Sequence, residues 1–148
     1  MHFDLVDRVL EQTPERIVTL KQVTAAEEYL QDHFPTFPVL PGVLMLEAMV
    51  QAARRLCDAR GMHRAVLGQV RALKYGRFVK PGASLRVEVS LLKALDDGSL
   101  EFRGEGLLVE AGIPAADLPT AVSGRFILRP VRLAEAPLAS ARESAVSC

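Results

Sequence analysis

The sequence contains no tryptophan and only two cysteines, Cys57 and Cys148, which lie far apart in the chain. Without paired cysteines we expect neither a disulfide framework nor a thiolate metal centre, and we predict two free thiols in a reducing compartment. The histidines, His2, His33 and His63, have no second ligand at metal-binding spacing. The pattern therefore predicts a protein without a metal site.

The chain also lacks an excess of one charge and a long hydrophobic run. Lys plus Arg and Asp plus Glu both number 18, so bulk charge indicates neither a nucleic acid nor an anionic membrane as partner. The longest nearly apolar stretch, residues 39–53, is interrupted by Glu47 and Gln51 and is shorter than the ~20 residues that a bilayer requires. No apolar run follows a basic stretch after Met1, so no signal peptide is expected. We predict a soluble, cytoplasmic protein.

The remaining composition suits one folded domain. With 148 residues, 49% of them hydrophobic, the chain can fill a single core. From residue 133 onward it is rich in Ala, Ser, Glu and Pro and has no periodicity, which is typical of disorder. We therefore expect a domain over residues 1–132 and a disordered tail over residues 133–148.

Patterns typical of β-strands and one long helix fill this domain. The expected strands cover residues 3–10, 16–23, 65–79, 84–95, 100–109 and 121–128. Thr24, with Glu27 three residues later, predicts the N-cap of a short helix. A long helix is expected from Val43 to Ala59, with a stop near Gly61. Six strands and one long helix predict an α+β fold with an antiparallel sheet around the helix.

The long helix contains a carboxylate where an apolar residue is expected. Between Val43 and Ala53 only Glu47 and Gln51 are polar, so the first turns should be buried on all sides. Buried carboxylates are rare unless they are paired, and Gln51 at i+4 can reach Glu47. Glu47 is therefore a candidate for acid–base chemistry. The alternative, that Glu47 follows an exposed seam and bonds an arginine, stays open.

Two further residues next to this helix are candidates for chemistry. His33 begins a loop that Pro35, Pro38 and Pro41 stiffen, which is a preorganised position for a base, although a structural histidine is the alternative. Gly42 directly precedes the expected helix, where backbone N–H groups lack intrahelical acceptors and can hold a developing oxyanion. An ordinary glycine at a helix start is the alternative there.

The stretch from Asp32 to Gln51 resembles the signature of the 3-hydroxyacyl-[acyl-carrier-protein] dehydratases of fatty-acid synthesis. His-Phe-Pro, Pro-Gly-Val, Glu-Ala-Met and Gln follow in the family's order and spacing. A looser resemblance extends over about residues 3–129. Two departures are Asp32, where the family usually has Gly, and Arg54-Arg55, where small apolar residues are common.

The resemblance implies a hotdog fold and a dimer whose sheets join edge to edge, often assembled further into a hexamer as a trimer of dimers. It places the active sites in apolar tunnels at the dimer interface, with His33 from one subunit and Glu47 from the other. Gly42 N–H would polarise the thioester carbonyl and Gln51 would orient Glu47. The implied chemistry uses no cofactor.

The implied activity is that of a hydro-lyase, which converts (3R)-hydroxyacyl thioesters to trans-2-enoyl thioesters in fatty-acid or related acyl-chain synthesis. The partner would be an acyl carrier protein. The expected tunnel lining is Phe34, Phe37, Leu40, Val43 and Met49. The residues expected at the carrier-docking surface are Arg54, Arg55, Lys74, Arg77 and Lys80. The alternatives are another hotdog thioester enzyme, such as a thioesterase, and a non-catalytic acyl-binding protein.

Overall fold

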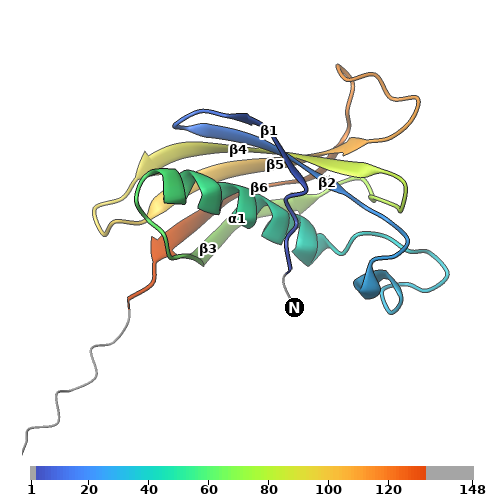
Figure 1. Cartoon of the computed structure of the whole chain (residues 1–148), viewed down its shortest axis with the longest axis horizontal. Coiled ribbons are helices and arrows are strands. Elements are labelled where there is room, and N and C mark those ends of the chain that lie inside the picture. Colours follow the sequence, from blue (N-terminus) through green and yellow to red (C-terminus); the bar gives the residue numbers. More distant parts are fainter. Residues whose placement is uncertain (1–2, 133–148) are drawn as a thin grey trace, which may run out of the picture.

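A computed structural model describes residues 3–132 and shows one antiparallel sheet packed on one long α-helix (Figure 1). Residues 133–148, for which we expected a disordered tail, lie outside the described residues. The strands follow the order β1-β2-β4-β5-β6-β3 across the sheet. The elements are β1 (Arg8–Gln12), β2 (Arg16–Gln22), η1 (Glu28–Leu30), α1 (Gly42–Ala59), β3 (Ala65–Tyr75), β4 (Ser84–Ala94), β5 (Leu100–Val109) and β6 (Thr120–Pro130). The α+β prediction is confirmed.

The core lies between α1 and the sheet face that it covers. Side chains alternate along each strand, so every second residue faces the helix, as Phe102 on β5 and Phe126 on β6 do. Both rings are fully buried and stack with their centroids 5.7 Å apart. The helix approaches closely at Gly104, where an added Cβ would lie 2.6 Å from Met49 Sδ. This tight packing fixes the helix, and with it the residues at its N-terminus.

Turn residues end the elements largely where the sequence predicted. Gly61 after α1 and Gly98 between β4 and β5 both have a φ of +83°, which glycine adopts without strain. β1 begins at Arg8 rather than at Phe3, because the segment before it runs to α1 instead of pairing in the sheet. β3 ends at Tyr75 rather than at Val79. Gly76 and Arg77 still donate to β6 carbonyls, whereas the Val79 carbonyl accepts from Leu40 in the loop before α1.

The predicted helix cap at Thr24 is wrong. The short helix is a single 3₁₀ turn, η1, which Glu27 precedes without any side-chain capping bond. The Glu27 carboxylate instead accepts a hydrogen bond of 2.8 Å from the buried ammonium group of Lys21. Because this ion pair engages Glu27, its side chain does not form the capping box.

The expectation that the first turns of α1 are buried on all sides is also wrong for the single chain. The sheet covers only one side of α1, and its other side stays open over the described residues (Figure 1). Val43 is 70% exposed and the Glu47 side chain is 32% exposed. Within this described part of the chain, no helix has the length and hydropathy to cross a bilayer.

Candidate active site

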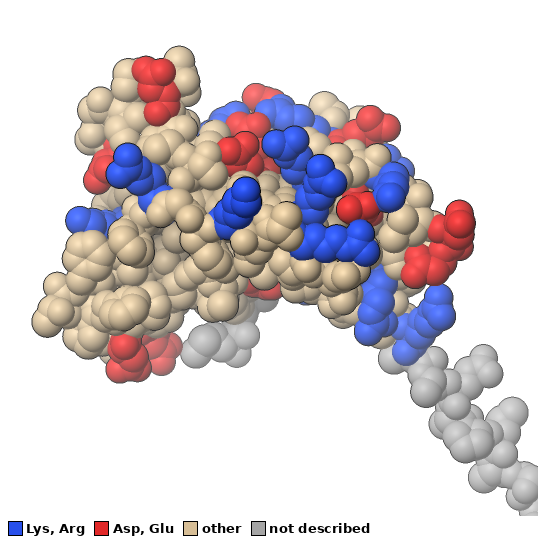
Figure 2. Space-filling model, turned by 180° about the vertical axis from the view of Figure 1, so that it is seen from behind, with Lys and Arg blue, Asp and Glu red and all other residues tan. Residues whose placement is uncertain are grey.

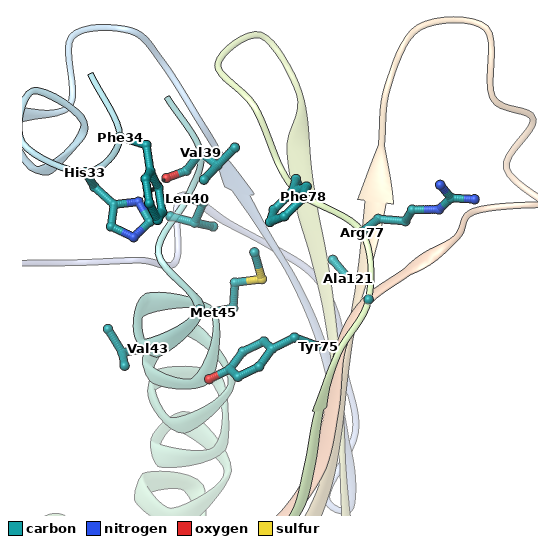
Figure 3. Close-up of a pocket in the computed structure, with 12 residues that line it drawn as sticks. His33, Phe34, Val39, Leu40, Val43, Met45, Tyr75, Arg77, Phe78 and Ala121 are labelled. Carbon is teal, nitrogen blue, oxygen red and sulfur yellow. Dashed lines mark hydrogen bonds between the residues drawn. The ribbon is translucent and has the colours of Figure 1, made fainter. Parts of the chain in front are cut away.

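A cavity of about 380 Å³ opens at the N-terminus of α1, between the helix, the proline-rich loop and the end of β3 (Figure 3). Its walls are mostly apolar, which is typical of a site for a hydrocarbon chain. The lining residues are His33, Phe34, Val39, Leu40, Gly42, Val43, Met45, Tyr75, Gly76, Arg77, Phe78 and Ala121. Two of the three residues predicted to carry chemistry, His33 and Gly42, therefore share one cavity.

The protonation pattern of the His33 ring follows from one hydrogen bond. Its Nδ1 lies 3.0 Å from the carbonyl oxygen of Val39, and a carbonyl only accepts, so Nδ1 carries the hydrogen. The neutral ring then has its lone pair on Nε2, which is the form that a general base requires. The loop is held in turn, because Leu40 N–H donates to the Val79 carbonyl at 2.8 Å.

Backbone strain occurs directly beside this histidine. Phe34 has a φ of +55°, a left-handed conformation that a residue with a bulky side chain rarely adopts. Its ring packs edge-on against His33, with the two centroids 4.4 Å apart. Strained residues of this kind concentrate at functional sites, where the surrounding structure holds them. The conformation fixes the imidazole at the edge of the cavity.

Gly42 brings a free backbone donor to the same cavity. It is the first residue of the 18-residue α1, so its N–H has no intrahelical acceptor and lies at the positive end of the helix dipole. The Tyr75 ring packs on its Cα, and a Cβ added there would lie 2.8 Å from Tyr75 Cε1. Any side chain at this position would require the ring or the helix start to move. Burial raises the pKa of the Tyr75 hydroxyl, so this side chain stays neutral.

Glu47 is held by the glutamine that the sequence predicted as its partner. Gln51 Nε2 donates to Glu47 Oε1 at 3.1 Å, and Gln51 Oε1 accepts from Leu5 N–H at 2.7 Å. Because the Leu5 amide can only donate, it fixes which end of the Gln51 amide faces the carboxylate. The segment before β1 thereby orients Glu47 through Gln51.

Glu47 has a second partner, an arginine. Arg54 Nη1 donates to the same Oε1 at 3.1 Å, and Arg54 Nε donates to the Ala65 carbonyl at 3.2 Å. Glu47 thus follows an exposed seam and bonds an arginine, as the alternative interpretation had it, but it also contacts Gln51. Over residues 3–132 no hydrogen bond to the other carboxylate oxygen, Oε2, is found. That oxygen remains available to a group from outside the chain.

The single chain does not bring His33 and Glu47 into one cavity, since Glu47 is absent from the lining. Of the predicted lining residues, Phe34, Leu40 and Val43 do face the cavity. Phe37 instead packs edge-on against Phe78, outside the lining, and Met49 is fully buried in the core.

The predicted docking residues do not form one surface. Arg77 lines the cavity with its guanidinium directed outward (Figure 3). Lys80 lies 4.6 Å from the centre of the Phe37 ring. Arg54 is paired with Glu47, and Arg55 with Asp4 at 3.7 Å. Lys74 lines a different pocket, together with Arg103 and Arg125. Only Arg77 and Lys80 remain beside the cavity.

Two features were not predicted from the sequence, the position of Tyr75 and the identity of Arg54 as the arginine that bonds Glu47. The second had a signal, because residues seven apart lie on the same face of a helix after two turns. Among the described residues, no group of three His, Cys, Asp or Glu side chains is arranged to hold a metal.

Comparisons with known proteins identify the family of this chain. A family model described as the ApeI dehydratase matches residues 9–109. The chain is 42% identical over 95 residues to FabZ, a 3-hydroxyacyl-[acyl-carrier-protein] dehydratase, from Desulforamulus reducens, covering 62% of this chain and 67% of that protein. FabZ from Ruminiclostridium cellulolyticum is 37% identical over 119 residues, covering 70% and 83%. The chain belongs to the ApeI- and FabZ-like dehydratase family.

Solved structures place the ApeI- and FabZ-like chain in the expected fold. The dehydratase heterocomplex ApeI:P from Xenorhabdus doucetiae has a TM-score of 0.61 at 20% identity, covering 86% of this chain and 98% of that one. A hypothetical thioesterase with coenzyme A from Streptococcus pneumoniae has a TM-score of 0.61 at 10% identity, covering 82% of each chain. Likeness at this level of identity concerns the fold alone, and the predicted hotdog fold is confirmed.

Proposed function

We propose that this protein removes water from 3-hydroxyacyl thioesters and yields trans-2-enoyl thioesters. The observation that carries the proposal is that His33 and Gly42 line the same apolar cavity. The hydrogen bond to Val39 leaves His33 Nε2 as an acceptor, and Gly42 offers a backbone donor at a helix start. A base and an oxyanion donor are what removal of a proton beside a thioester carbonyl requires.

In the proposed reaction His33 Nε2 takes the proton from Cα of the substrate. The electron pair of that C–H bond moves toward the thioester oxygen, where the Gly42 N–H and the α1 dipole stabilise the developing charge. The pair then returns to form the Cα–Cβ double bond as the Cβ–O bond breaks. The leaving hydroxyl takes a proton from Glu47, directly or through a water that Glu47 holds, and departs as water.

In this proposal Glu47 comes from a second copy of the chain. Glu47 lies outside the cavity of its own chain, and its Oε2 has no partner among the described residues. β3 lies at one edge of the sheet, and its edge backbone groups can pair with another strand. The family resemblance implies a dimer whose two sheets join edge to edge, and the β3 edges are the proposed junction. A trimer of such dimers would give a hexamer. In either assembly the side of α1 that is open in the single chain would face a neighbour.

We further propose that the substrate arrives on an acyl carrier protein, in fatty-acid or related acyl-chain synthesis in the cytoplasm. The names of the FabZ relatives support this partner. Arg77 and Lys80, beside the cavity, are the basic residues suited to an acidic carrier surface. Charge reversal of both should raise the KM for carrier-bound substrate and leave a small free thioester unaffected. Equal effects on both substrates would favour coenzyme A thioesters instead.

The thioesterase alternative shares the fold but makes a different product. It needs a carboxylate and a water, whereas a histidine with a fixed tautomer beside a helix-start donor has no necessary place in it. Incubation of the purified protein with crotonyl thioester separates these possibilities. A dehydratase run in reverse removes the enoyl absorbance without releasing thiol, and His33→Ala should abolish this change. Release of free thiol at the same rate would instead identify a thioesterase, and no change with either readout would leave only acyl binding.

A further inference from the structure

We infer that the sheet face opposite α1 carries a binding site for a small anion with two or more phosphate groups. Arg71 on β3, Arg125 on β6 and Arg103 on β5 lie directly opposite one another in the strand register. All three are exposed, and adjacent strands lie about 4.8 Å apart, so the arginines form one row across three strands. Figure 2 shows Lys and Arg side chains gathered on this face.

The arginine row lacks acidic partners. Arg71 donates to the neutral amide of Gln69 at 2.9 Å, and Arg103 and Arg125 form no ion pair among residues 3–132. The nearest acids on this face flank Arg103 along β5, and both are engaged elsewhere. Glu101 pairs with Lys93 at 3.4 Å and Glu105 accepts from Thr120 Oγ1 at 2.7 Å. Like charges directly opposite one another destabilise a sheet, so this row carries a cost in the free protein.

A strained bulge adds a fourth cation to the row. Arg71 lies opposite Arg125 and Lys74 lies opposite Ser123, so β3 contains one residue more than β6 between these two pairs. In a regular strand residues 71 and 74 would face opposite sides, because side chains alternate. The extra residue turns Lys74 to the face of Arg71, and Ala72 adopts a φ of +51° to make the bulge. The strained residue Ala72 thus belongs to the bulge that adds the positive charge of Lys74 to the row.

These side chains surround a concave site rather than a flat surface. A pocket of about 280 Å³ is lined by Ala72, Lys74, Arg103, Ser123, Gly124 and Arg125. No acidic residue contributes to the lining, and the Ser123 hydroxyl adds a neutral donor. This pocket is separate from the cavity of His33 and shares no lining residue with it.

The chemistry of the lining selects the ligand class. Guanidinium groups bind phosphate oxygens through two parallel hydrogen bonds, and an ammonium group adds a point charge. Three lining cations with Arg71 beside them exceed what one carboxylate can neutralise, whereas linked phosphates carry several charges in a small volume. Binding would also relieve the repulsion between Arg103 and Arg125.

Calorimetric titration of the full-length protein with inorganic tripolyphosphate, at an ionic strength held constant with KCl, tests the site. We expect saturable binding of one tripolyphosphate per chain, and binding of single phosphate weaker by about tenfold or more. Arg103→Gln and Arg125→Gln should each raise the Kd by about tenfold or more. Arg129→Gln is the matched control, since Arg129 is exposed on β6 outside this pocket, and it should change the Kd by less than about twofold. A parallel titration of ADP against inorganic diphosphate identifies whether a nucleotide or a free polyphosphate is preferred.

Stability and activity complete the test. Arg125→Gln should melt no lower than the wild type, because it removes like-charge contacts, and Arg125→Lys keeps the charge and should weaken binding less. Both should hydrate crotonyl thioester at the wild-type rate, so failure here leaves the proposed dehydration untouched. An equal loss of binding in Arg129→Gln, or no binding at constant ionic strength, would overturn the inference. So would a hexaglutamate peptide that binds more tightly than tripolyphosphate and depends on Arg125, because an acidic protein would then be the partner.

Discussion

Replacing Gly42 by alanine should lower kcat strongly while it changes the melting temperature little. The added Cβ would lie 2.8 Å from Tyr75 Cε1 and 2.9 Å from Cζ, so the ring and the helix start must move apart. A misplacement of about 1 Å can cost about 100-fold in rate, and loss of an oxyanion donor costs about 10²–10³ in kcat. We expect kcat for crotonyl thioester hydration to fall by about 10- to 100-fold. Alanine favours helices over glycine by up to about 1 kcal/mol, so the melting temperature should fall little.

The cause of the loss can be tested with the ring removed. In a Tyr75→Ala background the added methyl group meets no aromatic ring, so Gly42→Ala should reduce kcat by less than about threefold there. Gly68→Ala is the control, because its added Cβ would meet the flexible Arg129 side chain at 3.3 Å and the Ile127 carbonyl oxygen at an ordinary contact distance of 3.5 Å. It should retain full activity. An equal loss from Gly42→Ala with and without Tyr75, or no loss in either, would refute the role given to Gly42.

Gln51, Cys57 and Glu88 allow three further tests. Gln51→Leu should lower the free energy of unfolding by about 1–3 kcal/mol, because Leu5 N–H loses its acceptor, and should lower kcat as well; an unchanged kcat would remove Gln51 from the site. Burial raises the pKa of the Cys57 thiol to about 11, so in a Cys148→Ser background a thiol reagent at pH 8 should label the native protein far more slowly than the unfolded one. Burial raises the pKa of Glu88, but hydrogen bonds from two arginines outweigh it and hold that pKa below its usual 4.5. The ionised Glu88 therefore stabilises the folded protein at pH values above the usual pKa of 4.5, and this stabilisation is lost as the pH falls through the lowered pKa. Glu88→Gln should flatten the decline in melting temperature on the acid side.

Much of the fold was predictable because local chemistry and tertiary packing agree. β5 follows a strand pattern ended by turns, and its observed bounds match the prediction. Thr24 shows where local rules fail. The capping box expected there is absent because Lys21 engages the carboxylate of Glu27. Lys21 is close to Glu27 in the sequence, but the strand pattern does not show that it is buried in the sheet with its ammonium group on this carboxylate. No local pattern shows which partner a surface carboxylate will take.

The candidate site was predictable for residues that act through backbone position or helical spacing. Gly42 at the helix start and Gln51 one turn after Glu47 are both found where the sequence indicated. Tyr75 was missed because it reaches Gly42 from a strand that is remote in the sequence. Met49 was expected at the tunnel, but the helix turns it toward Gly104 in the core. Apolar residues of one helix do not reveal which face meets the sheet and which meets the substrate.

We propose that His33 of one subunit and Glu47 of another complete each site, and a mixing experiment tests this most directly. His33→Ala and Glu47→Gln should each be nearly inactive alone. If two copies form a symmetric dimer and exchange freely, half of the dimers are mixed, and each mixed dimer has one site with both groups intact. Crotonyl thioester hydration should then recover to about a quarter of the wild-type rate per site. No recovery, with exchange demonstrated by labelled subunits, would contradict a site shared between subunits.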